Sequence, residues 1–312
     1  MKHLLVTFLL MAPVICGSPP TRPMARREAA YSGPIIDVHL HTEPPLSAIG
    51  KPNPFTGVKG TSSTIELRDA TLKECEKYHI VRAVLNAWPG TADEWVKSDP
   101  KRFLLAPMVL KNNAKPALPV PALRQQLRDG KARLIGEITA QYVGLRPDDP
   151  VLEPYWKLAE ELDLPVMIHM GTSFAGTAYA GYPAFRLSLG NPMLLEEVLV
   201  RHPKLRLWFA HGGEPWTEET FALMSQYPQV YMDVATLDWI GGRERFHAFL
   251  QQAIRRGFGK RILFGSDQMA WPDAIGLAVE NVDSAEFLTP EQKRDIFYAN
   301  AVRFLRLTEP LD

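Results

Sequence analysis

The sequence predicts a (β/α)8 barrel, and three observations support this prediction. From residue 34 onward, short runs rich in Val, Ile, Leu and Phe alternate with longer segments whose apolar residues have helical spacing. The short runs number eight. They are almost continuously apolar, which is typical of parallel strands buried on both faces. Eight such units favour a closed barrel over an open doubly wound sheet, whose first strand usually leads into a Gly-rich phosphate turn.

The predicted strands and helices follow each other in strict alternation. The strands are residues 35–38, 80–86, 103–110, 132–138, 166–169, 205–211, 230–234 and 262–265. The helices are residues 64–78, 91–98, 121–129, 150–162, 192–201, 217–227, 243–257 and 272–282, and several begin with Pro or a capping residue. The amphipathic segment 290–307 lies beyond the eighth unit, so we expect it to cap or buttress the barrel.

Two connections are longer than a compact barrel requires. Residues 42–63 follow the first strand and contain four Pro and three Gly, and residues 171–191 follow the fifth strand and contain four aromatic residues. Both leave the barrel at the C-terminal ends of its strands, where active sites of this fold are built. We expect lids or pocket walls there. Trp239 and Trp271 follow strands seven and eight and are candidates for an apolar wall, with ordinary packing as the alternative.

The composition excludes several classes of protein. Of the 312 residues, 46% are hydrophobic, which excludes disordered and fibrous chains. The 35 Lys and Arg balance the 35 Asp and Glu, and no basic block is present, so we expect no nucleic-acid partner. The two cysteines, Cys16 and Cys75, are too few for a disulfide scaffold or a thiolate metal site.

The N-terminus has the pattern of an export signal. The apolar run 4–16 stands between Lys2 and the small residues Gly17 and Ser18, and it is too short to span a bilayer. We therefore predict a signal peptide over residues 1–18, a linker over 19–33, a barrel domain over 34–312, and a periplasmic or secreted protein. A buried N-terminal helix is the alternative. A lipid anchor on Cys16 is not expected, because Ile15 is larger than the residue that usually precedes such a cysteine.

Polar residues at the ends of buried strands indicate a site, because a buried polar group needs a partner or a purpose. Four of the eight histidines fall at such ends, namely His39, His41, His169 and His211. His39 and His41 are two residues apart, so on a strand both side chains point to the same side. We expect both imidazoles to enter the barrel mouth while Val38 and Leu40 face the helices.

Three of these histidines and Asp267 form a candidate metal site. His39, His41, His169 and Asp267 would converge from strands one, five and eight, and imidazole and carboxylate ligands suit a divalent metal, with zinc expected first. A satisfied core histidine is the alternative for His169. A helix cap ahead of Pro272 is the alternative for Asp267.

Two further polar residues have several open roles. His211 is a candidate ligand of a second metal ion or a candidate general acid/base, with ordinary packing as the alternative. Glu137 ends the fourth strand and could bridge two metal ions, contact the substrate, or pair with Arg133 or Arg186. The number of metal ions, one or two, depends on its role.

Several segments together resemble the metal-dependent amidohydrolase superfamily, in the amidohydrolase-related branch that includes aminocarboxymuconate semialdehyde decarboxylase. The matching segments are 37–41 (DVHLH), 166–169 (VMIH), 209–213 (FAHGG), 264–267 (FGSD) and 296–301 (IFYANA). The resemblance covers about residues 34–307. It implies a divalent metal, usually zinc, at the residues that match His39, His41, His169 and Asp267, with His211 at the catalytic step. Glu137 departs from the mononuclear pattern of that branch, because binuclear relatives place a bridging carboxylate or a carboxylated lysine there.

The expected function is hydrolysis of a small amide, ester or lactone through a metal-activated water. Asp267 would accept the water proton and pass it to the leaving group, and His211 would stabilise the developing oxyanion. The alternative is nonoxidative decarboxylation of an aromatic or unsaturated carboxylic acid at the same metal. A metal-free binding barrel would leave four polar groups unsatisfied around an empty mouth. Arg186 either pairs with a substrate carboxylate or braces its loop, and a homo-oligomer is compatible with the sequence.

Overall fold

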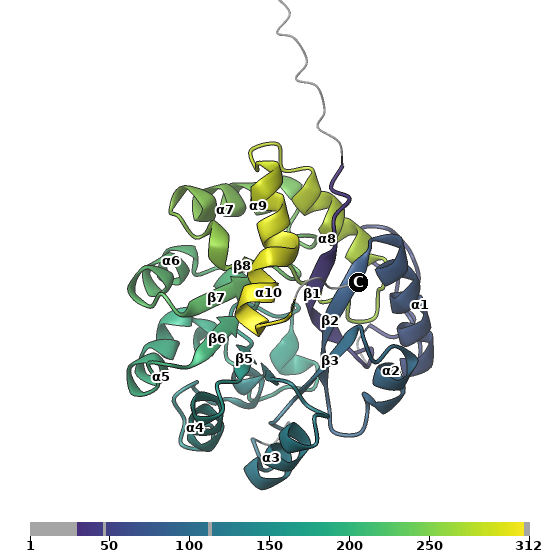
Figure 1. Cartoon of the computed structure of the whole chain (residues 1–312). Helices are drawn as coiled ribbons and strands as arrows, with labels where there is room; N and C mark the ends of the chain where they lie inside the picture. Colours follow the sequence, from purple (N-terminus) through teal and green to yellow (C-terminus); the bar gives the residue numbers. More distant parts are fainter. Residues whose placement is uncertain (1–29, 46–47, 112–113, 309–312) are drawn as a thin grey trace, which may run out of the picture. The chain divides into compact units, whose positions relative to one another are not determined.

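Eight parallel strands alternate with helices in the compact unit that begins at Tyr31 (Figure 1). The computed structural model describes residues 30–45, 48–111 and 114–308. The predicted signal peptide, Cys16 and residues 19–29 of the predicted linker lie outside the described residues. No helix within the described ranges is long and apolar enough to cross a membrane.

All eight predicted strands are present in the predicted order. They are β1 (Ile35–His41), β2 (Ile80–Ala87), β3 (Phe103–Pro107), β4 (Ile135–Ile138), β5 (Pro165–Ile168), β6 (Arg206–Phe209), β7 (Val230–Asp233) and β8 (Ile262–Leu263). The first strand is longer than predicted because it continues through both histidines. The third, fourth, sixth and eighth are shorter than predicted, because the apolar residues at their ends lie outside the strand ladders although most of them are buried.

Each strand is followed by a helix close to its predicted place. These are α1 (Thr64–Lys77), α2 (Asp93–Ser98), α3 (Val120–Arg128), α4 (Glu153–Glu161), α5 (Glu196–Arg201), α6 (Thr217–Gln226), α7 (Arg243–Arg255) and α8 (Ala274–Asp283). The C-terminal segment contains α9 (Pro290–Arg294) and α10 (Asn300–Leu305), joined by the π-helical turn η7 (Asp295–Ala299). Thr289 caps α9 in a capping box, which explains why this segment begins where the sequence predicts.

The strands form two parallel sheets, ordered β1-β2-β3 and β4-β5-β6-β7-β8. Backbone hydrogen bonds cross both gaps between them. Val38 N donates to Phe264 O at 2.9 Å and Asp267 N donates to His39 O at 2.8 Å, and at the other gap Arg133 N donates to Leu105 O at 3.1 Å. The strands therefore follow each other around a ring in chain order, although the ring is not closed as one continuous sheet. This arrangement confirms the predicted parallel α/β fold.

The buried residues divide into an outer and an inner cluster. On β5, Val166 and Ile168 belong to the outer cluster between strands and helices, whereas Met167 between them belongs to the inner cluster. The inner cluster also contains Phe304 of α10, which packs edge-to-face on Trp208 with ring centroids 5.5 Å apart. The C-terminal segment therefore caps the inner core, as predicted.

The path of β1 corrects one expectation from the sequence. Val38 packs in the inner cluster, not against the helices, whereas Leu40 lies in the outer cluster as predicted. The cause is a shift in the pairing of β1 with β2 between Asp37 and Leu40. Such an irregularity interrupts the alternation of sides along a strand.

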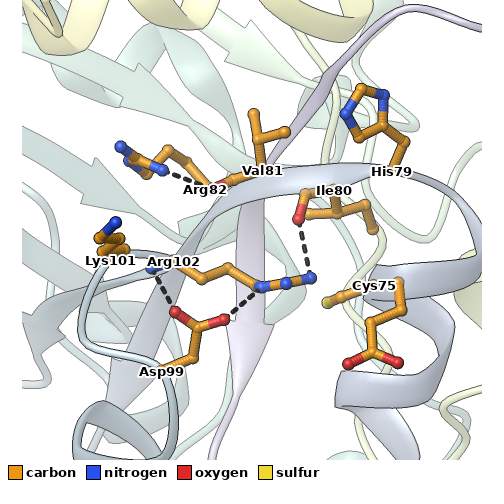
Figure 2. A pocket seen from close by; sticks show the side chains of 9 residues that line it. Cys75, His79, Ile80, Val81, Arg82, Asp99, Lys101 and Arg102 are labelled. Atoms are coloured by element: carbon orange, nitrogen blue, oxygen red, sulfur yellow. Dashed lines mark hydrogen bonds and ion pairs between the residues drawn. The ribbon is translucent and has the colours of Figure 1, made fainter. Parts of the chain in front are cut away.

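A pocket of about 400 Å³ lies where β2 and β3 begin (Figure 2). Arg102 crosses it and donates to the Asp99 carboxylate at 2.8 Å and to the Ile80 carbonyl at 3.0 Å. Cys75 also lines this pocket, and burial raises the pKa of its thiol to about 12. The pocket is at the N-terminal ends of the strands, so it is separate from the end at which the predicted metal ligands lie.

Candidate metal centre

The structure brings six predicted site residues together at the C-terminal ends of the strands. His39 and His41 end β1 and Glu137 lies on β4, whereas the other three lie in the connections that begin after β5, β6 and β8: His169, His211 and Asp267. All are buried except His41, whose side chain is 19% exposed. Segments separated by more than two hundred residues thus supply one cluster of imidazoles and carboxylates.

A first group of ligand atoms comes from β1, from the segment after β8 and from Glu137 on β4. His41 Nε2 lies 3.2 Å and His39 Nε2 lies 3.8 Å from Asp267 Oδ1. Glu137 Oε2 lies 3.7 Å from His41 Nε2 and 4.0 Å from His39 Nε2. The ligand atoms of His39, His41 and Asp267 lie within 4.8 Å of one another, and Glu137 Oε2 lies near both imidazoles of this group.

A second group lies on the other side of Glu137. His169 Nδ1 is 2.7 Å from Glu137 Oε1, and His211 Nε2 is 3.2 Å from His169 Nδ1. His211 Nε2 also lies 3.9 Å from Glu137 Oε1. The two oxygens of one carboxylate therefore face two different groups of histidines.

Backbone carbonyls orient the two histidines of the second group. His211 Nδ1 is 3.0 Å from the Ala235 carbonyl, and His169 Nε2 is 3.1 Å from the Thr172 carbonyl. A carbonyl can only accept, so we assign the hydrogen to the nitrogen that faces it. In the neutral imidazole, His211 Nε2 then presents a lone pair to the site, as a metal ligand does. His169 Nδ1 lies 2.7 Å from the ionised Glu137 carboxylate and donates to it, so this nitrogen would give up its hydrogen to bind a metal ion.

Asp233 at the end of β7 accepts hydrogen bonds that orient two of the site histidines. Its Oδ2 accepts from His39 Nδ1 and from Trp208 Nε1, both at 3.2 Å. Its Oδ1 accepts from the backbone N–H groups of His211 at 2.9 Å and Ala235 at 3.1 Å. This is the carboxylate–histidine arrangement that orients a metal ligand, and our sequence analysis missed it. The available signal was a carboxylate at the end of a buried strand.

Two site residues have left-handed backbone conformations. His211 has φ 61° and Asp267 has φ 47°, a region that side chains other than Gly rarely adopt. Gly213, with φ 65°, follows in the same turn, and a Cβ there would lie 2.4 Å from Thr220 Oγ1. The His-Gly-Gly sequence therefore allows the chain to turn sharply and aim the imidazole into the mouth.

The charges of the site act strongly on each other. Burial lowers the pKa of His39, but the carboxylates of Asp267 and Asp233 outweigh burial and raise that pKa to about 10. Burial raises the pKa of Glu137, but nearby imidazoles, His169 foremost, lower it to about 2. Burial and the neighbouring imidazoles lower the pKa of His211. The site therefore keeps ionised carboxylates and a neutral His211 at neutral pH, and it attracts a cation.

Two unpartnered atoms test whether a metal fits. His39 Nε2 and Asp267 Oδ1 are buried and have no hydrogen-bond partner among the described residues. Each would cost about 1–3 kcal/mol if it stayed unsatisfied. Both belong to the group formed by His39, His41 and Asp267, whose ligand atoms lie within 4.8 Å of one another. The residues present therefore fit a divalent cation.

The structure excludes one of the roles considered for Glu137. Arg133 and Arg186 are exposed, and the ion pairs of Glu137 within the described residues are all with imidazoles. The Arg186 guanidinium donates to the carbonyls of Pro183 and Phe185 at 3.0 and 2.8 Å, so it braces its own loop. Pairing with Arg133 or Arg186, one of the three roles left open for Glu137, is thus not found in the structure, because neither side chain reaches the barrel mouth.

Aromatic residues surround the mouth. Trp239 is 2% exposed and donates to the Ser266 carbonyl at 2.7 Å, so it packs within the protein. Trp271 donates to the Lys51 carbonyl at 2.9 Å and fastens the loop after β1. Tyr142, which the sequence analysis did not single out, packs edge-to-face on His169 with ring centroids 4.9 Å apart.

A comparison with known protein families identifies the family of this chain. The sequence profile of the amidohydrolase family matches residues 36–307. The chain belongs to the amidohydrolase family. Among curated proteins, this amidohydrolase is 22% identical over 160 residues to the protein fluG of Emericella nidulans. The match covers 46% of this chain and only 18% of that longer protein.

Solved structures resemble the amidohydrolase over most of its length. A TIM-barrel protein from Bordetella bronchiseptica has a TM-score of 0.65 at 18% identity and covers 87% of this chain and 98% of that one. A probable 2-pyrone-4,6-dicarboxylic acid hydrolase from Acinetobacter baumannii has a TM-score of 0.60 at 12% identity, with coverages of 88% and 99%. A 2,6-dihydroxybenzoate decarboxylase from Rhizobium has a TM-score of 0.61 at 16% identity, also with coverages of 88% and 99%. These likenesses support the TIM-barrel fold, and they include both a hydrolase and a decarboxylase.

Proposed function

We propose that this amidohydrolase is a metal-dependent hydrolase of a small amide, ester or lactone. The observation that carries the proposal is the position of Glu137, whose Oε1 faces His169 at 2.7 Å while its Oε2 faces His41 at 3.7 Å. A carboxylate placed in this way suits the bridge of a two-metal site. Two adjacent ions stabilise both the attacking and the leaving oxygen of a displacement, which favours hydrolysis over loss of carbon dioxide.

We propose Zn²⁺ as the metal, because imidazole and carboxylate ligands suit it. His39, His41 and Asp267 would hold one ion, His169 and His211 would hold a second, and Glu137 would contact both. When bound, the metal supplies Lewis-acid polarisation of the carbonyl group and lowers the pKa of a water molecule toward about 7.

The protein residues would move the protons. Burial raises the pKa of Asp267, but His39 and His41 outweigh burial and hold it below its usual range, so the carboxylate stays ionised. It is therefore suited to accept the proton of the attacking water and to pass it to the leaving group. His211 Nδ1 donates its hydrogen bond to the Ala235 carbonyl, which leaves a lone pair at Nε2 of the neutral imidazole. This supports a role of His211 as a metal ligand more than the stabilisation of an oxyanion, for which Nε2 would have to donate a hydrogen bond.

The first test counts metal ions in the protein with the Glu137→Gln substitution. We expect about two ions per chain in the wild type by mass spectrometry, and one or none in the variant, because an amide bridges cations poorly. Turnover should fall at least about 10²-fold. Glu160→Gln is the matched control, because Glu160 also contacts a histidine, His202 at 3.1 Å, away from the site. A wild type that holds one ion would contradict the bridging role.

The second test separates the two reaction classes. Lactones, esters and amides are offered beside aromatic carboxylic acids, and incorporation of ¹⁸O from water and release of carbon dioxide are measured together. We expect label in the product and no carbon dioxide. Release of carbon dioxide without label would make the protein a decarboxylase.

A further inference from the structure

His41 differs from the other three histidines of the metal centre in how its ring is held. In each of the others, a carboxylate or a carbonyl group contacts the second ring nitrogen: Asp233 for His39, Thr172 for His169 and Ala235 for His211. His41 Nδ1 has no hydrogen-bond partner among the residues that the structure describes. The ring of His41 therefore depends on its backbone for its position.

One side chain contacts both backbone polar groups of His41. Gln268 Oε1 accepts from His41 N at 3.0 Å, and Gln268 Nε2 donates to His41 O at 2.9 Å. A carboxamide carries a donor and an acceptor in one plane, as a peptide unit does, so it can take the place of a neighbouring strand. Gln268 is fully buried, so water does not compete for these two bonds.

The segment after β8 does not pair with His41 as a strand. β8 ends at Leu263, and beyond it Asp267 N still donates to His39 O at 2.8 Å. Asp267 and Met269, on either side of Gln268, have left-handed backbone conformations with φ 47° and 48°. A chain with this conformation is not extended and cannot continue a ladder. The Gln268 side chain therefore bridges the place where the backbone bonds between β1 and the segment after β8 stop.

We propose that Gln268 is a positioning residue that holds His41 against Asp267. The ligand atoms His41 Nε2 and Asp267 Oδ1 lie 3.2 Å apart, and Gln268 directly follows Asp267 in the chain. One short segment thus supplies a ligand and also holds the backbone of a second ligand. The inference rests on the metal centre proposed above, and it adds a residue that sets the geometry of this ligand pair.

The first measurement tests the contact in the metal-free protein. Gln268→Met keeps the length of the side chain but removes both bonds to His41. We expect exchange of the His41 amide hydrogen, followed by NMR, to become at least about tenfold faster in the variant, because that hydrogen loses its acceptor. An unchanged exchange rate would overturn the proposal. A wild type that binds no metal would contradict the proposed function, and this measurement would still decide the role of Gln268.

The second measurement is the affinity for Zn²⁺, determined by competition with a chelator. Gln268→Met should weaken it about 10–100-fold. Asn300→Leu is the matched control, because the Asn300 amide is also fully buried and donates to the carbonyls of Gly259 and Ile262, at 2.8 and 2.7 Å, where β8 begins. It should lower stability and leave the Zn²⁺ affinity unchanged. An equal loss of affinity in both variants would overturn the proposal, because general loosening of the fold would explain it.

A double-mutant cycle tests whether Gln268 acts through His41. In the His41→Ala background, Gln268→Met should weaken Zn²⁺ binding by less than about twofold further, because the side chain that Gln268 positions is gone. The same loss in both backgrounds would assign the effect to Asp267 and overturn the proposal. Gln268→Asn serves where Gln268→Met fails to fold. Its amide is one methylene shorter and cannot reach both groups of His41, so it should weaken Zn²⁺ binding in the same direction.

Discussion

Both carboxylate oxygens of Asp233 accept hydrogen bonds, so Asp233 is not itself a candidate metal ligand. It orients two candidate ligands, His39 through its side chain and His211 through its backbone N–H. Asp233→Asn should keep the fold, because the amide has nearly the same shape. It should weaken metal affinity about 10–100-fold, because the amide no longer favours the proton on His39 Nδ1. Competition with a chelator measures this affinity. Unchanged affinity together with unchanged turnover would show that the contact is only structural.

Asp238 should make the stability of the protein depend on pH. Both of its carboxylate oxygens are buried without a hydrogen-bond partner among the described residues, and burial raises its pKa well above the ordinary value, with Asp37 adding to the effect. The folded state therefore keeps a proton that the unfolded chain releases near pH 4. The free energy of unfolding should fall as pH rises above that value, because the unfolded state binds fewer protons there.

Asp238→Asn removes this linkage. Between about pH 4 and pH 8, the free energy of unfolding measured with urea should therefore fall less steeply with pH in the variant than in the wild type. Asp148→Asn is the control, because Asp148 pairs with Arg146 and its pKa is lowered, not raised. If the free energy of unfolding of Asp238→Asn fell with pH as steeply as that of the wild type, other groups would be responsible for the decline.

At this scale the sequence predicts the residues that bear the chemistry better than those that support them. His39 and Asp267 could be found because a polar side chain at the end of an apolar run is costly without a partner. Asp233 ends a buried strand and carries the same signal, but nothing local marks it as the partner of His39, and Tyr142 in the connection after β4 carries no such signal. Their roles depend on which strand ends become neighbours in the ring, and no local pattern carries that information.

At the scale of elements, α10 is expected to contribute strongly to stability. Phe304 is 4% exposed and packs on Trp208 and Tyr231, with ring centroids 5.5 and 4.6 Å away. Phe304→Ala should lower the free energy of unfolding by about 3–5 kcal/mol, because it opens a cavity at the base of the inner core. Urea denaturation measures the loss. A loss below about 1 kcal/mol would show that the base of the core repacks.

The order and kind of the elements follow from local sequence, but the path of β1 does not. Alternation predicts one face for Val38 and the other for His39, whereas both point inward because the strand shifts its pairing at this point. The shift accompanies contacts with the segment after β8, where the Asp37 carboxylate accepts from Ser266 Oγ at 2.6 Å. The local sequence pattern does not indicate this contact, because Asp37 and Ser266 are far apart in the chain.

At the scale of the whole molecule, removal of the metal should lower stability. Binding to the folded state alone stabilises a protein, by about 4 kcal/mol at a thousand times the dissociation constant. Treatment with a chelator at neutral pH should therefore lower Tm by about 5 °C or more, and added Zn²⁺ should restore it. Differential scanning calorimetry measures both steps. An unchanged Tm would show that the folded and unfolded chains bind metal equally or not at all.

The cap at the base of the barrel has a consequence for synthesis in the cell. Tyr31 stacks on Phe297, and Ile36 shares the inner cluster with Phe304, so the first strand is completed by residues that the ribosome makes long after it. Contacts this distant in sequence form late in folding. We therefore expect the interior of the barrel to stay open toward water until the segment with η7 and α10 has been made, and the nascent chain to need protection from aggregation during that interval.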